Sequence, residues 1–130
     1  MIIVDTSVWI DYFNGKLSEE TDSLDTMLGN QEILLGDLIL TEILQGFQED
    51  RLFREAQNML ESFPIVSMLG MQLAIQSAKN YRTLRKRGVT VRKTIDVMIG
   101  TYCIERHIPL LYADRDFDRM VRHLGLHSVL

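Results

Sequence analysis

Two aspartates follow short apolar runs near the two ends of the chain. Asp5 comes directly after residues 2–4, and Asp114 comes directly after residues 110–113. Apolar runs of this length are compatible with buried strands, and ligands of open parallel sheets bind beyond the carboxyl ends of the strands. We therefore expect both carboxylates at one edge of a sheet. Taken singly, each Asp could instead cap a following helix, which is the commoner role of such a residue.

Two further acids, Glu42 and Asp96, lie within apolar segments, where an ionised carboxylate is costly to bury without a partner. Asp96 has a second explanation in the first turn of an expected helix, because a negative charge there complements the helix dipole, and Glu42 has one if it faces the surface. Together with Asp5 and Asp114 they form a set of acids without a His or Cys cluster. Such a set suits a hard divalent cation, Mg²⁺ or Mn²⁺, before Zn²⁺. Asp116 adds a fifth oxygen ligand or caps the next helix.

The formal net charge of −4 hides a division along the chain. Residues 1–62 carry 13 acidic and 3 basic residues, whereas residues 63–130 carry 5 acidic and 11 basic ones. Within the second half, residues 79–93 hold seven of the 14 basic residues and no acid, and we call this segment the basic stripe. It is either a solvated helix face or a track for phosphates. Five of its members closely precede Asp96 and are candidate phosphate contacts, with Arg92 favoured: Arg85, Lys86, Arg87, Arg92 and Lys93.

The elements that must position these side chains alternate along the chain. Short apolar runs predict strands at 1–4, 33–35, 65–67, 108–113 and 128–130. Helical spacing and cap residues predict helices over 8–13, 17–28, 37–46, 51–62, 70–87, 94–106 and 117–124, and the helix at 94–106 is apolar almost all round, as a buried helix is. This alternation predicts an α/β fold with a mainly parallel central sheet of four to five short strands flanked by helices.

Length and composition limit the remaining possibilities. The chain has 130 residues, enough for one core, and we expect a single domain over residues 1–130. Hydrophobic residues at 46% and charged residues at 25% are typical of a soluble globular protein. Cys103 is the only cysteine, the first residues carry no basic signal, and no apolar run reaches the roughly 18 residues of a membrane span. We therefore expect a cytoplasmic location and no membrane association.

Three segments carry a resemblance to a known family: MIIVDTSVWIDYFNG, GDLILTEILQGF and TIDVMIGTYCIERHIPLLYADRDFDRM. With the acids they contain, they resemble the PIN-domain ribonucleases, specifically the VapC type of toxin from bacterial and archaeal toxin-antitoxin (VapBC) pairs. The resemblance runs nearly end to end, with the blocks in the family's order and near its spacing. It implies a PIN-like three-layer domain.

The resemblance also implies a role for each acid. Asp5, Glu42, Asp96 and Asp114 would form a quartet that holds Mg²⁺ or Mn²⁺, with Asp116 as an auxiliary acid. A bound ion lowers the pKa of a coordinated water, and a nearby carboxylate can accept the proton, so that the hydroxide attacks a phosphodiester. The implied activity is therefore endoribonuclease cleavage that leaves a 5′-phosphate and a 3′-hydroxyl.

The implied partners are an RNA substrate, a cognate VapB-type antitoxin and a second copy of the chain in a homodimer. In the family, the antitoxin's C-terminal segment lies in a groove near the region of Trp9, Tyr12 and Phe13, although core packing explains these aromatic residues better. Ser7 stands where relatives carry Ser or Asn close to the metal. It is predicted to give a supporting hydrogen bond or to cap a helix.

Other classes fit less well. A response-regulator receiver requires an adjacent acidic pair near the first strand and a Lys after the last, and neither is present. A haloacid-dehalogenase-like phosphatase requires a second Asp where the chain has Ser7. Two alternatives remain open. One is a PIN-fold module that binds RNA or protein without catalysis, which the complete quartet argues against, and the other is a PIN nuclease outside any toxin-antitoxin pair.

Overall fold

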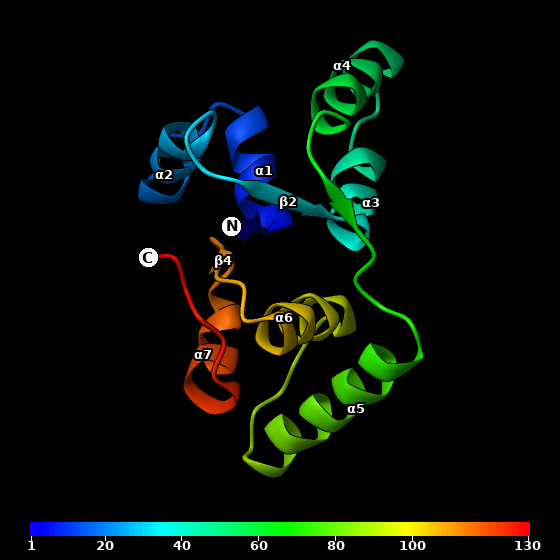
Figure 1. Cartoon of the computed structure of the whole chain (residues 1–130), viewed down its shortest axis with the longest axis vertical. Coiled ribbons are helices and arrows are strands. Elements are labelled where there is room, and N and C mark those ends of the chain that lie inside the picture. Colours follow the sequence, from blue (N-terminus) through cyan, green and yellow to red (C-terminus); the bar gives the residue numbers. More distant parts are fainter.

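A parallel sheet of four short strands lies at the centre of the computed structural model, which describes residues 1–130 (Figure 1). The strands are β1 (Ile2–Val4), β2 (Ile33–Gly36), β3 (Ile65–Val66) and β4 (Leu110–Leu111), and their order in the sheet is β3-β2-β1-β4. Each neighbouring pair is parallel. The carboxyl ends of β1 and β4 therefore meet at one edge, as the positions of Asp5 and Asp114 predict.

Helices connect the strands and cover both faces of the sheet. They are α1 (Thr6–Phe13), α2 (Glu19–Met27), α3 (Asp37–Gln45), α4 (Asp50–Leu60), α5 (Met71–Lys86), α6 (Thr94–Arg106) and α7 (Asp118–Leu124), with a short 3₁₀ helix, η1 (Arg115–Phe117), before α7. In Figure 1, α1 and α2 lie above the strands, and α5, α6 and α7 lie below them. The predicted α/β fold with a mainly parallel sheet is confirmed.

Burial follows from this layering. Every residue of β1 and β2 is buried, as expected for a parallel sheet that is covered on both faces. Seven residues of α6 are buried, which confirms the prediction of a buried helix. Where α5 packs against α6, the side-chain amide of Asn80 donates a 2.9 Å hydrogen bond to Thr101 Oγ1, so these two buried polar side chains are paired, whereas the buried hydroxyl of Ser77 on α5 has no partner. The core thus fixes α6, the helix that carries Asp96.

The predicted last strand differs from what is observed. Residues 128–130 form no strand, and only an isolated parallel bridge joins Ser128 to Leu110. The pairing consists of two backbone hydrogen bonds, from Leu110 N–H to the His127 carbonyl at 2.9 Å and from Val129 N–H to the Leu110 carbonyl at 3.1 Å. At the other elements the differences are shifts of boundaries. The helix expected from residue 17 begins at Glu19, because Ser18 forms a capping box with Thr21.

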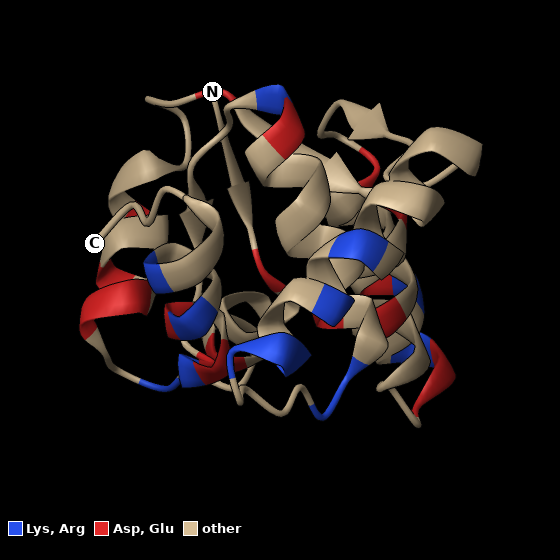
Figure 2. Cartoon of the chain, turned by 90° about the horizontal axis from the view of Figure 1, so that it is seen from below, with Lys and Arg blue, Asp and Glu red and all other residues tan.

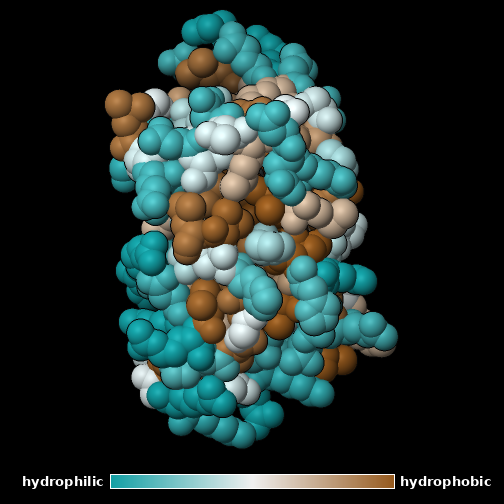
Figure 3. Space-filling view, turned by 60° about the vertical axis from the view of Figure 1, so that its left-hand side comes forward, coloured by the Kyte–Doolittle hydropathy of each residue, from teal (hydrophilic) through white to brown (hydrophobic).

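Both ends of the chain lie on the same side of the molecule (Figure 1). Figure 3 turns this side forward and shows apolar side chains gathered across the middle of the face, with hydrophilic ones around them. Met1 and Leu130 are among the exposed large hydrophobic residues, at 54% and 55% exposure. Apolar surface of this kind is common on folded proteins. No helix has the length and apolar character that a membrane crossing requires.

Gly36 provides a test of the packing at the end of β2. A Cβ atom at this position would overlap the side chain of Met68, which is fully buried. We expect Gly36→Ala to lower the free energy of unfolding by about 1–3 kcal/mol, measured by urea denaturation, because overpacking forces side chains from their preferred rotamers. The matched control is Gly46→Ala, where the nearest atom to a Cβ is the Ile43 carbonyl oxygen at 3.4 Å. Equal losses in the two variants would contradict the packing argument.

Candidate metal centre

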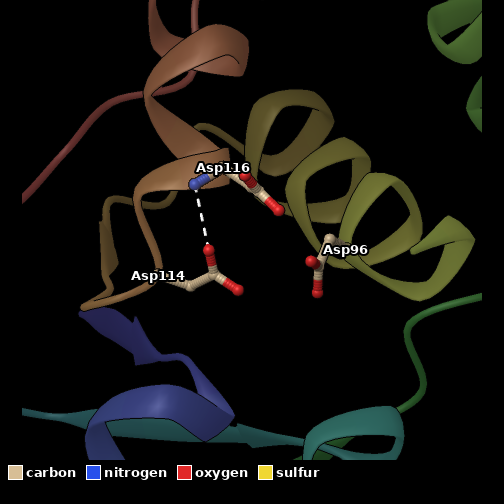
Figure 4. A group of neighbouring side chains, drawn as sticks. All are labelled: Asp96, Asp114 and Asp116. Carbon is tan, nitrogen blue, oxygen red and sulfur yellow. Dashed lines mark hydrogen bonds between the residues drawn. The ribbon is translucent and has the colours of Figure 1, made fainter. Parts of the chain in front are cut away.

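Three aspartates from the last part of the chain converge beside the sheet edge (Figure 4). Asp96 lies in the first turn of α6, Asp114 is the N-cap of η1, and Asp116 lies within η1. One carboxylate oxygen from each lies within 4.8 Å of those of the other two. The backbone N–H of Asp116 donates a 3.0 Å hydrogen bond to Asp114 Oδ1. This cap orients Asp114 through one oxygen only, and its carboxylate is turned towards that of Asp96 (Figure 4).

The other two predicted acids lie in the same cleft as Asp96 and Asp114. Asp5 directly follows β1 and is 3% exposed, and Glu42 projects from α3. The cleft has a volume of about 650 Å³. Its lining residues are Asp5, Thr6, Ser7, Ile10, Glu42, Gln45, Gly46, Lys93, Asp96 and Asp114. The fold therefore brings four acids from four separate parts of the chain into one cleft, and Asp116 joins them through Asp96 and Asp114.

Ser7 links the ends of β1 and β4 at this cleft. Its backbone N–H and its hydroxyl both donate to Asp5 Oδ2, at 3.0 and 2.6 Å. The same hydroxyl oxygen accepts hydrogen bonds from the backbone N–H groups of Ala113 and Asp114, at 3.0 and 3.2 Å. The N-cap of α1 is Asp5 and not Ser7. Ser7 therefore supports Asp5, and Asp5 combines a capping role with a place in the cleft.

Thr6 is a site residue that the sequence analysis did not single out. Its hydroxyl donates a 2.7 Å hydrogen bond to Glu42 Oε1, although the two residues lie 36 positions apart. The neighbouring residues Thr6 and Ser7 thus fix two different acids. The available signal was a pair of hydroxyl residues directly after a strand-ending Asp, but in sequence such a pair indicates a helix start and does not identify a distant partner.

Burial and the nearness of other carboxylates raise the pKa of acids in the cleft. Burial raises the pKa of Asp96 to about 7; Lys93 opposes this rise, whereas Asp5, Asp114 and Glu42 add to it. Burial also raises the pKa of Asp5, against the hydrogen bonds from Ser7. Asp96 Oδ2 is buried and accepts no hydrogen bond from the protein. An unpartnered oxygen among several carboxylates fits a hard divalent cation, whose positive charge would relieve both the desolvation and the repulsion.

Two members of the basic stripe reach the acids. Arg92 donates to Asp116 Oδ2 through Nε and Nη2, at 3.2 and 2.9 Å. Lys93 Nζ lies 3.7 Å from Asp96 Oδ2 and 3.5 Å from Asp114 Oδ2. These contacts place both side chains against carboxylates of the candidate site.

The other three predicted phosphate contacts lie elsewhere on the surface. The guanidinium of Arg85 lies 5.9 Å from the centre of the Tyr81 ring, and Arg87 Nη1 donates a 3.1 Å hydrogen bond to the carbonyl of His123. Lys86 is exposed at the end of α5. Figure 2, seen from below, shows ribbon segments of basic and acidic residues, blue and red, interleaved on this side of the molecule. The phosphate-binding role of all five basic residues stays a prediction.

Comparison with known proteins identifies the family of this chain. The PIN domain family matches residues 2–122. The chain is 27% identical over 130 residues to ribonuclease VapC11 of Mycobacterium tuberculosis, covering 98% of this chain and 97% of the relative. It is 30% identical over 125 residues to ribonuclease VapC1 of Methanocaldococcus jannaschii, covering 96% and 84%. The chain therefore belongs to the PIN domain family, and these curated relatives within it are VapC ribonucleases.

Solved structures share the fold at lower sequence identity. VapBC2 from Rickettsia felis, bound to a DNA fragment from its promoter, superposes with a TM-score of 0.76 at 15% identity, covering 98% of this chain and 97% of that chain. VapBC-1 from nontypeable Haemophilus influenzae superposes with a TM-score of 0.74 at 19% identity, covering 98% and 96%. At these identities the likeness establishes the shared fold.

The raised pKa of Asp96 makes stability depend on pH. A carboxyl group whose pKa is higher in the folded protein than in the unfolded chain favours folding in its protonated form. Its contribution is therefore complete below about pH 4 and is lost as the pH rises through about 7. We expect Asp96→Asn, which is neutral at every pH, to stabilise the metal-free protein by about 1–3 kcal/mol more at pH 8 than at pH 4.

Urea denaturation in the presence of a chelator measures this difference. The control is Glu105→Gln, which neutralises an exposed acid of the same helix. A gain from Asp96→Asn that is the same at both pH values, or that is matched by the control, would contradict the assigned pKa shift.

Proposed function

We propose that this chain is the toxin of a type II toxin-antitoxin pair and acts as an endoribonuclease that requires Mg²⁺ or Mn²⁺. One observation carries the proposal: Asp5, Glu42, Asp96 and Asp114 come from separate elements and line one cleft. Support comes from the curated relatives, which are VapC ribonucleases and align with nearly the whole chain. The substrate is RNA, cleaved at its phosphodiester bonds.

In this proposal the divalent cation is held by Asp96, Asp114 and Asp116, whose carboxylates lie closest together, with Asp5 and Glu42 completing the set. When bound, the ion supplies an activated water and offsets the negative charge of the phosphate. The protein's own groups do the rest. Ser7 and Thr6 hold Asp5 and Glu42 in place through their hydroxyl groups. One carboxylate of the cleft accepts the proton of the attacking water.

The basic stripe positions the substrate in the same proposal. Arg92 and Lys93 lie at the acids and would contact the phosphate nearest the cleaved bond, whereas Arg85, Lys86 and Arg87, which lie elsewhere on the surface, would contact more distant phosphates of the RNA. We further propose that residues 1–130 form one domain, for which the single cluster of 25 buried core residues is support. A cytoplasmic location and a homodimer complete the proposal by resemblance to the VapC family.

A groove beside the acidic cleft is the proposed seat of the antitoxin. It has a volume of about 590 Å³ and runs between the end of α1 and α4, with Phe13, Phe47, Leu52 and Met59 in its lining. Gly46 lines both this groove and the acidic cleft, so the two hollows adjoin. Of the predicted aromatic cluster, Phe13 lines the groove, whereas Trp9 is fully buried. An apolar segment of the antitoxin fits here and would bring a basic side chain to the carboxylates.

Cleavage of RNA by the purified chain tests the enzymatic proposal. We expect cleavage with Mg²⁺ or Mn²⁺ and none with a chelator. Asp5→Asn and Asp96→Asn should each reduce the rate by about a hundredfold or more, because each removes a charged oxygen ligand. Glu105→Gln, outside the cleft, should keep the normal rate, and circular dichroism checks that all variants fold. Activity that survives both Asp substitutions would exclude the metal centre and leave the binding module as the better description.

Binding of the antitoxin is a separate test, made with the product of any small open reading frame beside the gene. We expect Leu52→Glu to weaken the complex by about tenfold or more in a pull-down or calorimetric titration, because it places a charge in the apolar groove. Leu17→Glu is the matched control, since Leu17 is 90% exposed and lies outside the groove. If no neighbouring protein binds and relieves toxicity, the chain is a PIN nuclease outside any toxin-antitoxin pair.

A further inference from the structure

A lysine side chain lies among the carboxylates of the candidate metal centre. Lys93 is the residue before α6 and lines the acidic cleft. Its ammonium nitrogen is 3.5 Å from Asp114 Oδ2 and 3.7 Å from Asp96 Oδ2. Both distances exceed the 2.7–3.2 Å of a well-formed N–H···O hydrogen bond. The ammonium is therefore attracted by both charges without being locked to either.

The contact between Lys93 and Asp96 matters because of the state of Asp96 Oδ2. The oxygen is buried and accepts no hydrogen bond, so the Lys93 ammonium is the positive charge that compensates it. A lysine is protonated at neutral pH unless its pKa falls by several units. Lys93 therefore places a positive charge in the space between two of the proposed metal ligands.

Arg92 is bonded to its carboxylate more tightly than Lys93 is. It donates two hydrogen bonds of 2.9 and 3.2 Å to a single oxygen of Asp116, and a planar guanidinium suits such a geometry. Lys93 has a flexible four-carbon stem that ends in a compact ammonium, which lies 3.5 Å or more from both carboxylates. Both basic side chains are open to water, at 75% exposure for Arg92 and 52% for Lys93, so the difference between them lies in their hydrogen bonds. Of the two basic residues at the site, Lys93 is the one that a stronger cation can displace.

We propose that Lys93 is a displaceable counter-ion of the acidic cleft, which competes with a divalent cation for Asp96 and Asp114. Two cations a few ångströms apart repel each other, and the divalent one binds carboxylate oxygens more strongly. With the metal bound, the Lys93 side chain turns to the mouth of the cleft, where it can meet an RNA phosphate. The inference rests on the proposed metal centre and adds that the Lys93 ammonium lowers the affinity of this centre for the cation.

The test measures binding of Mn²⁺ to the full chain without RNA. Electron paramagnetic resonance of free Mn²⁺ gives the dissociation constant directly. We expect Lys93→Met to bind Mn²⁺ about threefold to tenfold more tightly than the original protein at low ionic strength, and the difference should shrink in high salt. Lys93→Arg keeps the charge and should stay close to the original affinity. Lys79→Met is the control for net charge, because Lys79 is an exposed residue of α5.

The outcomes separate this inference from the proposed function. Unchanged or weaker Mn²⁺ binding in Lys93→Met would overturn the counter-ion role and leave Lys93 as a phosphate contact or a support of the site. If neither protein binds Mn²⁺, both proposals fail. If the original protein and Lys93→Met bind Mn²⁺ with the expected difference but no RNA is cleaved, the counter-ion role is supported and the proposed nuclease activity is contradicted. Thermal unfolding confirms that the variant is folded, and Lys93→Gln replaces it if it is not.

Discussion

The hydroxyl of Ser7 joins the ends of β1 and β4 at the point where the acidic side chains meet. Each strand of this sheet is short, with three residues in β1 and two in β4, so the ladder alone gives few hydrogen bonds at this edge. The carboxylates that follow the strands repel one another and tend to separate the two strand ends. The Ser7 hydroxyl accepts hydrogen bonds from the backbone N–H groups of Ala113 and Asp114 and donates one to Asp5. It thereby opposes that separation and sets the spacing between Asp5 and Asp114.

Concentrating acids in this way costs stability, and the molecule offsets the cost only in part. Asp5 and Glu42 each receive a short hydrogen bond from a hydroxyl, and Asp116 is paired with Arg92. Asp96 keeps a buried oxygen without a hydrogen-bond partner, and its pKa rises to about 7. Incomplete compensation is what a cation site requires, because oxygens that are fully satisfied by the protein have little to gain from an ion.

The basic stripe illustrates how a local pattern is divided by the fold. Residues 79–93 are continuous in sequence, yet they form the second half of α5 and the loop that leads into α6. On the helix, Arg85 lies over Tyr81. In the loop, Arg92 and Lys93 turn to the acids. Net charge is therefore a poor guide to this protein, since two of its basic side chains, Arg92 and Lys93, are paired with carboxylates of the candidate metal centre.

Much of the fold and the identity of the acids followed from the sequence. Strand ends, helix positions and the burial of α6 depend on the local spacing of apolar residues, and that spacing is written in the chain. The helix expected from residue 17 begins at Glu19, because Ser18 caps it through a capping box with Thr21. The prediction of a strand at 128–130 was wrong, because only Ser128 pairs with Leu110 of β4. Whether so short a segment pairs along its length depends on the neighbouring strand, which the local sequence does not show.

Only the tertiary structure decided which groups meet. Thr6 and Glu42 are 36 positions apart, and Arg92 and Asp116 are 24 apart, so no local period relates them. The sequence marked Lys93 as a phosphate contact, but the position of α6 in the fold placed its ammonium 3.7 Å from Asp96 and 3.5 Å from Asp114. The sequence by itself determined the kinds of residue and the elements that carry them. The distances between charges came from the crossing of strands and helices, because electrostatic interactions depend on separation in space and not along the chain.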